Sequence, residues 1–144
     1  MSDIQLSYAR PDVGFFSAGA CHILGFAFLE RYPQVGFRLR FIRPAPEFRG
    51  SHLYVSNGQL AFDAQGYVDE DELLRQHHDA LASLQPGWRA DVMDVEVCLA
   101  EFCAINNHHA PESFPEDVWQ RAQRHIAQFP ALRRETENYS GENK

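Results

Sequence analysis

The stretch SAGACHILGFAFLERYP, residues 17–33, decides how this chain folds. Apolar residues occupy every side of it between Ile23 and Leu29, which indicates a buried helix and not one with a solvent-exposed face. We expect the helix over residues 20–31, because Pro33 and Gly36 follow and end it. Cys21 follows small residues and lies near the beginning of this range. The sequence therefore also puts a thiol at the start of the buried helix.

The composition indicates one globular domain. The chain has 144 residues, 44% of them hydrophobic and 11 of them Phe, which is enough for a well-filled core. We expect a single domain over residues 1–135 and a polar, flexible tail over residues 136–144. The net charge of −7 argues against a nucleic-acid partner and against an acidic membrane surface. The longest apolar stretch, about ten residues, is too short to span a bilayer.

Three cysteines, Cys21, Cys98 and Cys103, are too few and too scattered for a disulfide scaffold. The first residues also lack the basic and apolar regions of a signal peptide. We therefore expect a reducing, cytoplasmic location.

The rest of the pattern predicts an α+β domain in which the buried N-terminal helix packs on a small, mainly antiparallel sheet. Residues 36–44 alternate apolar and basic side chains, as a strand does. Residues 69–84 form an amphipathic pattern that predicts a helix, and residues 88–97 predict a further strand. Additional C-terminal helices are expected over residues 98–105 and 115–129.

The segment SHLYVSNGQLAFDAQG, residues 51–66, is a predicted hairpin whose turn is Asn57-Gly58. One face of the hairpin is apolar and belongs to the core: Leu53, Val55, Leu60 and Phe62. A two-residue turn at Asn57-Gly58 pairs His52 directly with Asp63 on the opposite face. A carboxylate in that place can hydrogen-bond the imidazole, fix its tautomer and support its charged form.

Cys21, His52 and Asp63 together form a candidate catalytic triad. The free N–H groups and dipole of a helix N-terminus favour the thiolate of Cys21 and can bind a developing oxyanion. His52 then acts as the base and Asp63 orients it. Each residue alone has an ordinary structural explanation, as a buried hydrophobe, a strand-end histidine or a turn former. Their combination in one chain favours a catalytic site.

The motifs GACHILGFA, SHLYV and LAFDAQGY resemble the papain-like cysteine peptidase superfamily, and most closely its transglutaminase-like and NlpC/P60-like branches. The resemblance covers residues 17–67. It implies thiol attack on an amide or ester carbonyl through an acyl-enzyme, and a papain-like fold. Papain-type enzymes place an oxyanion-hole glutamine shortly before the cysteine. Residues 13–18 supply none, and Tyr8 is a candidate polar substitute.

Several other residues are candidates for a site. His22 and Tyr54, with Tyr8, are candidates for substrate contact. The segment HHD, residues 77–79, lies on a predicted amphipathic helix, where a solvated face is expected. The set Cys98, Cys103, His108 and His109 could suggest zinc, but its spacing lies outside the common zinc knuckle, so we expect no metal and no cofactor.

The sequence thus favours a thiol hydrolase or acyltransferase that acts on a peptide bond or another amide. The amide can belong to a protein. The alternative is a non-catalytic peptide- or protein-binding module on the same scaffold. Hydrolysis and acyl transfer stay open at this point, as does the oligomeric state.

Overall fold

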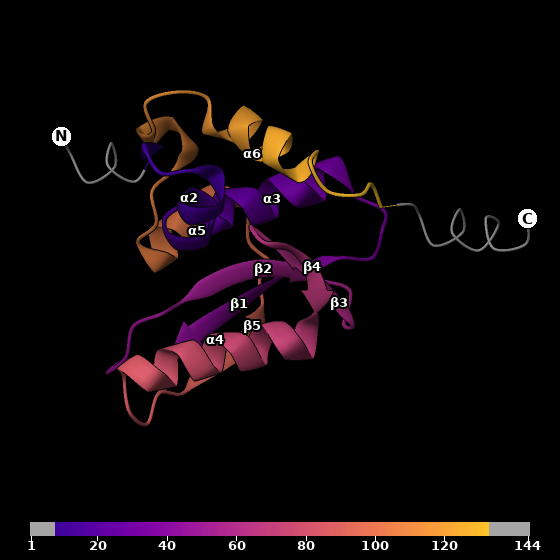
Figure 1. Ribbon diagram of the computed structural model, residues 1–144. Coiled ribbons are helices and arrows are strands. Elements are labelled where there is room, and N and C mark those ends of the chain that lie inside the picture. The colour runs from indigo at the N-terminus through magenta and orange to yellow at the C-terminus, as the bar shows by residue number, and fades with distance from the viewer. Residues whose placement is uncertain (1–7, 133–144) are drawn as a thin grey trace, which may run out of the picture.

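The computed structural model describes residues 8–132, which form a five-stranded antiparallel sheet between two helical layers (Figure 1). The strand order is β4-β3-β2-β1-β5. Helices α2, α3, α5 and α6 cover one face of the sheet and α4 covers the other (Figure 1). The chain is therefore α+β with an antiparallel sheet, as predicted. The expected tail, residues 136–144, lies outside the described residues.

The helices are α2 (Asp12–Ala18), α3 (Cys21–Arg31), α4 (Glu70–Leu84), α5 (Leu99–Asn106) and α6 (Val118–Ile126), with a short 3₁₀ turn η1 (Pro111–Ser113). The strands are β1 (Arg38–Pro44), β2 (His52–Ser56), β3 (Leu60–Asp63), β4 (Gly66–Asp69) and β5 (Ala90–Asp94). Helix α2 and strand β4 were not foreseen. No helix within residues 8–132 is both long enough and apolar enough to cross a membrane.

Helix α3 is the buried helix that the sequence predicts. It packs against β2 on one side and α6 on the other, and the side chains of Ile23, Ala27 and Phe28 are fully buried. The apolar face of the sheet below it carries Leu53 and Val55. A helix enclosed in this way needs apolar residues all round, which is the pattern of residues 20–31.

Gly25 allows α3 to approach the sheet closely. A Cβ atom at this position would lie 2.3 Å from Leu53 Cδ2 and 3.0 Å from Leu39 Cδ2. Leu53 is only 1% exposed, so its side chain has little room to move away. The distance between α3 and β2 is therefore set by the missing side chain at residue 25.

The β2–β3 hairpin forms, but its register differs from the predicted one by two residues. Val55 pairs with Phe62 and not with Leu60. The N–H of Asn57 donates to the carbonyl of Leu60, so the central turn residues are Gly58 and Gln59. Gly58 has a φ of 95°, as the first central position of a type II′ turn requires.

The side chain of Asn57 explains this shift. Its Oδ1 accepts from the backbone N–H groups of Gln59 and Leu60, at 3.0 and 2.7 Å, so Asn57 stabilises the turn from its first corner. A shift of two residues leaves every side chain on its predicted face. His52 and Asp63 therefore stay on the same face, as diagonal neighbours instead of a direct pair.

Replacement of Gly25 by Ala is expected to destabilise the protein by about 1–3 kcal/mol, because the new methyl group overlaps Leu53. Gly14→Ala is the matched control. Gly14 also lies inside a helix, but a Cβ there would meet only Arg10 Cβ at 3.8 Å. That change should stabilise by about 0.5–1 kcal/mol through helix propensity. Urea unfolding of both variants measures the difference, and equal effects would contradict a close contact at Gly25.

Candidate active site

Cys21 is the first residue of α3, and its side chain is 7% exposed. The preceding residue, Ala20, has no side chain that can cap the helix. The N–H groups of Cys21, His22 and Ile23 belong to the first turn, where a helix offers no internal acceptor. These donors, with the helix dipole, favour negative charge at this end of the helix.

His52 begins β2 and is held by Asp63 at the end of β3. His52 Nε2 lies 3.1 Å from Asp63 Oδ2, and the two side chains form an ion pair when the imidazole is protonated. The other carboxylate oxygen, Oδ1, accepts the N–H of Gln65 at 3.0 Å. Asp63 therefore closes the β3–β4 turn and orients His52 at the same time. Because Nε2 is engaged, Nδ1 is the nitrogen of His52 left to act on another group.

The protonation of Cys21 and His52 is coupled. Burial raises the pKa of the Cys21 thiol, but the neighbouring side chains of His108, His22 and His52 outweigh burial and hold that pKa well below its usual range. Burial lowers the pKa of His52, but hydrogen bonds with Asp63 and Cys21, and their charges, outweigh burial and raise it. A thiolate–imidazolium pair is the state that these directions favour at neutral pH.

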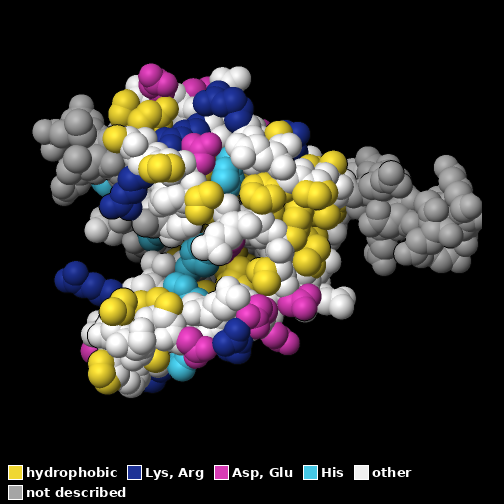
Figure 2. All heavy atoms as spheres, in the orientation of Figure 1, with side chains coloured by type: hydrophobic (Ala, Val, Ile, Leu, Met, Phe, Trp, Pro, Cys, Tyr) yellow, Lys and Arg dark blue, Asp and Glu magenta, His cyan; other side chains and the backbone are white. Residues whose placement is uncertain are grey.

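A pocket of about 220 Å³ opens beside His52 and Asp63. Its other lining residues are mostly polar: Ser17, Ser51, Gln65, Gln76, His77 and Leu73. Figure 2 shows histidine side chains gathered in the hollow between α4 and the helices on the other face of the sheet. The pocket gives a ligand access to the His52–Asp63 pair.

His77 is a site residue that the sequence interpretation missed. Its ring stacks on that of His52, with centroids 5.6 Å apart, and meets the Trp88 ring edge-on at 5.5 Å. Its Nε2 lies 2.7 Å from the carbonyl oxygen of Gly50. The expectation of a solvated HHD segment is therefore wrong for His77, because α4 lies across the sheet face that carries His52. It holds for His78, whose side chain is 57% exposed.

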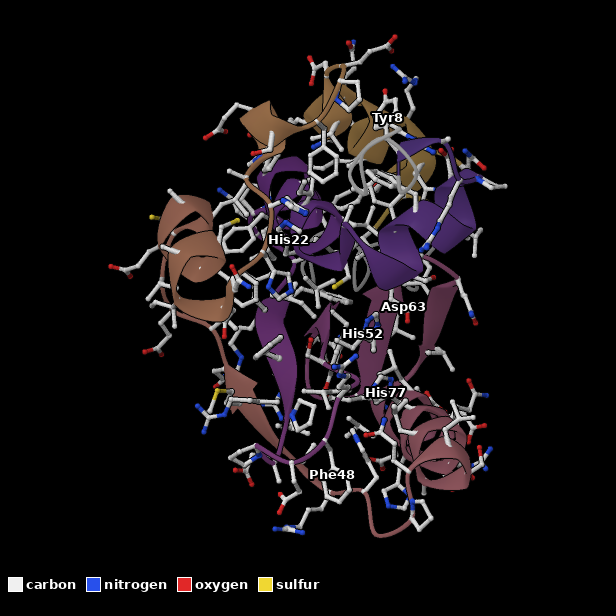
Figure 3. All side chains as sticks on the ribbon, turned by 90° about the vertical axis from the view of Figure 1, so that its left-hand side faces the viewer. Tyr8, His22, Phe48, His52, Asp63 and His77 are labelled. Carbon is white, nitrogen blue, oxygen red and sulfur yellow. The ribbon has the colours of Figure 1, made fainter. Side chains whose placement is uncertain are left out.

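The three residues predicted to contact substrate do not line this pocket. Tyr8 lies at the far end of the molecule from His52 (Figure 3), where its hydroxyl donates to Glu116. Tyr54 is buried and donates to Glu70 at 2.6 Å. His22 is fully buried, and its Nε2 lies 2.7 Å from the carbonyl oxygen of His109.

His108 lies beside Cys21. The set of Cys98, Cys103, His108 and His109, whose spacing argued against a zinc site, does not converge. Cys98 is exposed, and Cys103 Sγ donates to the carbonyl of His109 at 3.7 Å. Asn107 ends α5 in the left-handed conformation and returns the chain toward α3. The Asn-Asn pair at residues 106–107 is the sequence signal that could have indicated this return.

Iodoacetamide is expected to modify Cys21 about tenfold faster than the exposed Cys98 at pH 6, with EDTA present. An ordinary thiol with a pKa of about 8.5 is under about 1% thiolate at that pH. Cys21 keeps its thiolate down to its lowered pKa, and this gain exceeds the accompanying loss of nucleophilicity. Peptide mass spectrometry measures each rate.

The His52→Ala variant serves as the comparison for that experiment. It should slow alkylation of Cys21 severalfold at pH 6 and leave Cys98 unchanged, because it removes the imidazolium charge that stabilises the thiolate. A Cys21 rate with the same pH dependence as that of Cys98 would show that the thiol and imidazole are not coupled.

Comparisons of this chain with protein-family models, with curated proteins and with solved structures find no match. The site is therefore defined by its own geometry. That geometry combines a thiol at a helix N-terminus, an imidazole held by a carboxylate, and a polar pocket beside the imidazole and the carboxylate.

Proposed function

We propose that the protein is a papain-like thiol hydrolase or acyltransferase that acts on an amide bond. The observation that carries this proposal is the orientation of His52 by Asp63, which leaves Nδ1 of His52 for the coupled thiol of Cys21. The order of nucleophile, base and positioning residue along the chain matches the resemblance to the papain-like superfamily. The antiparallel sheet behind a buried helix is compatible with that superfamily.

The residues supply each step of acyl transfer. The Cys21 thiolate attacks the carbonyl carbon, and a C–S bond forms while the carbonyl oxygen becomes an oxyanion. The first-turn N–H groups of α3 stabilise that oxyanion. The C–N bond then breaks as His52 gives its Nδ1 proton to the departing amine, which leaves an acyl-enzyme. Water or a second nucleophile attacks the thioester, His52 takes its proton, and the Cys21 thiolate is released.

The pocket fits an amide substrate. Two primary amides, Gln65 and Gln76, and two hydroxyl groups, Ser17 and Ser51, line it. Such groups both donate and accept hydrogen bonds, so they can pair with the N–H and C=O groups of a peptide. We also propose a cytoplasmic location, where the free thiols of Cys21, Cys98 and Cys103 would stay reduced.

Exposure to p-nitrophenyl acetate is expected to acetylate Cys21 and release one p-nitrophenolate per chain in a burst. The activated ester needs no specific recognition, so the burst reports the nucleophile and its base alone. Stopped-flow absorbance measures the burst, and intact-protein mass spectrometry measures the acetylated species. Cys21→Ser should abolish both signals, and Cys98→Ser should leave both unchanged.

The Asp63→Asn variant distinguishes, in the same assay, the role of Asp63 in positioning His52 from its role in the β3–β4 turn. The asparagine keeps an oxygen that can accept the N–H of Gln65, so the turn is retained, but the negative charge beside His52 is lost. We expect the burst rate to fall by about tenfold or more, within the range that proton transfer contributes to catalysis. A wild-type chain that forms no Cys21 acyl adduct would refute the enzyme and favour the peptide-binding alternative.

A further inference from the structure

A second group of side chains converges on Cys21, apart from His52 and Asp63. The sulfur of Cys21 and one ring nitrogen each from His22 and His108 lie within 4.8 Å of one another. Cys21 and His22 are buried, and His108 is half-buried. In the acyl-transfer scheme above, neither His22 nor His108 has a role.

One ring nitrogen of each histidine is held by a backbone carbonyl. His22 Nε2 lies 2.7 Å from the carbonyl oxygen of His109, and His108 Nδ1 lies 2.9 Å from that of Asn106. A carbonyl can only accept, so both of these nitrogens carry the proton. When each ring is neutral, its unprotonated nitrogen is therefore Nδ1 in His22 and Nε2 in His108. Zinc-binding histidines are typically held in this way, with the second nitrogen bound to a carbonyl or carboxylate.

The environment of these nitrogens also indicates a ligand. His22 is fully buried, and its Nδ1 has no hydrogen-bond partner among residues 8–132. A buried polar atom without a partner costs free energy, which a bound group can recover. The rings of His22 and His108 meet edge-on at 4.8 Å, and Phe102 packs against both. An apolar shell of this kind excludes water from a metal and its ligands.

We propose that Cys21, His22 and His108 bind a zinc ion. One thiolate and two neutral imidazoles are ligands suited to zinc, and three protein ligands leave the fourth tetrahedral position open for water. Bond lengths in such a site put ligand atoms about 3.3–3.7 Å apart, so small side-chain rotations close it. Zinc and protons compete for the same ligand atoms, so zinc binding should weaken as the pH falls.

Zinc and an acyl group compete for the same sulfur. A Cys21 sulfur coordinated to zinc cannot attack a carbonyl or react with iodoacetamide. Inhibition of acyl transfer by zinc rests on the proposed function, but the binding of zinc does not. The site would make the thiol reactive only in the metal-free protein.

Titration of the full-length, tag-free and EDTA-treated chain with Zn²⁺ and Co²⁺ tests this site. We expect one metal ion per chain by competition with a chromogenic chelator. We also expect a thiolate-to-cobalt charge-transfer band in the near ultraviolet. Zn²⁺ should protect Cys21 from iodoacetamide. Cys21→Ser should abolish the charge-transfer band, because the thiolate is its source.

Two conservative variants test the histidines without loss of their structural hydrogen bonds. His22→Gln keeps a donor near the carbonyl of His109, and His108→Asn keeps one near the carbonyl of Asn106. Each should weaken zinc binding by about a hundredfold, since loss of an outer partner alone costs 10–100-fold. Circular dichroism checks that both variants are folded, and His108→Asn suffices if the buried His22 variant is not.

Cys98→Ser and His78→Ala are the controls, because both residues are exposed and should not affect binding. The proposal is overturned if the wild type shows no thiolate–cobalt band, if that band survives in Cys21→Ser, or if His108→Asn binds zinc as tightly as wild type. Fast alkylation of Cys21 without zinc binding would refute the metal site alone. Zinc binding without an acyl adduct would refute the enzyme alone.

Discussion

The close approach of α3 to β2 at Gly25 is the constraint on which the site depends. The missing side chain lets the helix lie directly on Leu53, the neighbour of His52. Cys21 lies four residues before Gly25, which is about one helical turn along the same face. The packing that buries the helix therefore also carries the thiol to the start of β2, where His52 is. Core packing and placement of the nucleophile are set by the same contact.

Asp63 has one role in the fold of the hairpin and another in the proposed catalysis. Its two oxygens do different work, because Oδ1 closes the turn into β4 and Oδ2 holds His52. A carboxylate anchored by its own turn has little rotational freedom left to lose when it pairs with the imidazole. His77 adds a second restraint, since its ring stacks on His52 from α4. The imidazole is thus fixed from the sheet and from the helix that covers it.

The sequence predicted the parts of the site that local patterns determine. The apolar run of residues 20–31 identified α3, and period-2 alternation put His52 and Asp63 on one face of the hairpin. The register was wrong by two residues because the side chain of Asn57 organises the turn, but an even shift preserves the face. Strand β4 was missed since its four residues carry too little periodicity to be distinguished from a loop.

The partners that the sequence did not reveal come from tertiary packing. His77 lies on α4 and His108 follows α5, and no local pattern indicates that the first reaches His52 and the second reaches Cys21. Tyr8 was expected near the thiol, but the guanidinium of Arg121 lies 4.7 Å from its ring centroid, and its hydroxyl pairs with Glu116. A distant cation from α6 thus fixes a residue whose sequence position alone suggested a role in the site.

Measurement of the His52 imidazole by nitrogen-detected NMR, across pH in metal-free protein, tests the coupling most directly. In wild type, His52 should stay protonated well above the ordinary histidine pKa of about 6.5, because the Cys21 thiolate and Asp63 both stabilise its charge. In Cys21→Ser the thiolate is absent, so the pKa of His52 should fall. An imidazole that titrates at the same pH in both proteins would contradict a thiolate–imidazolium pair at this site.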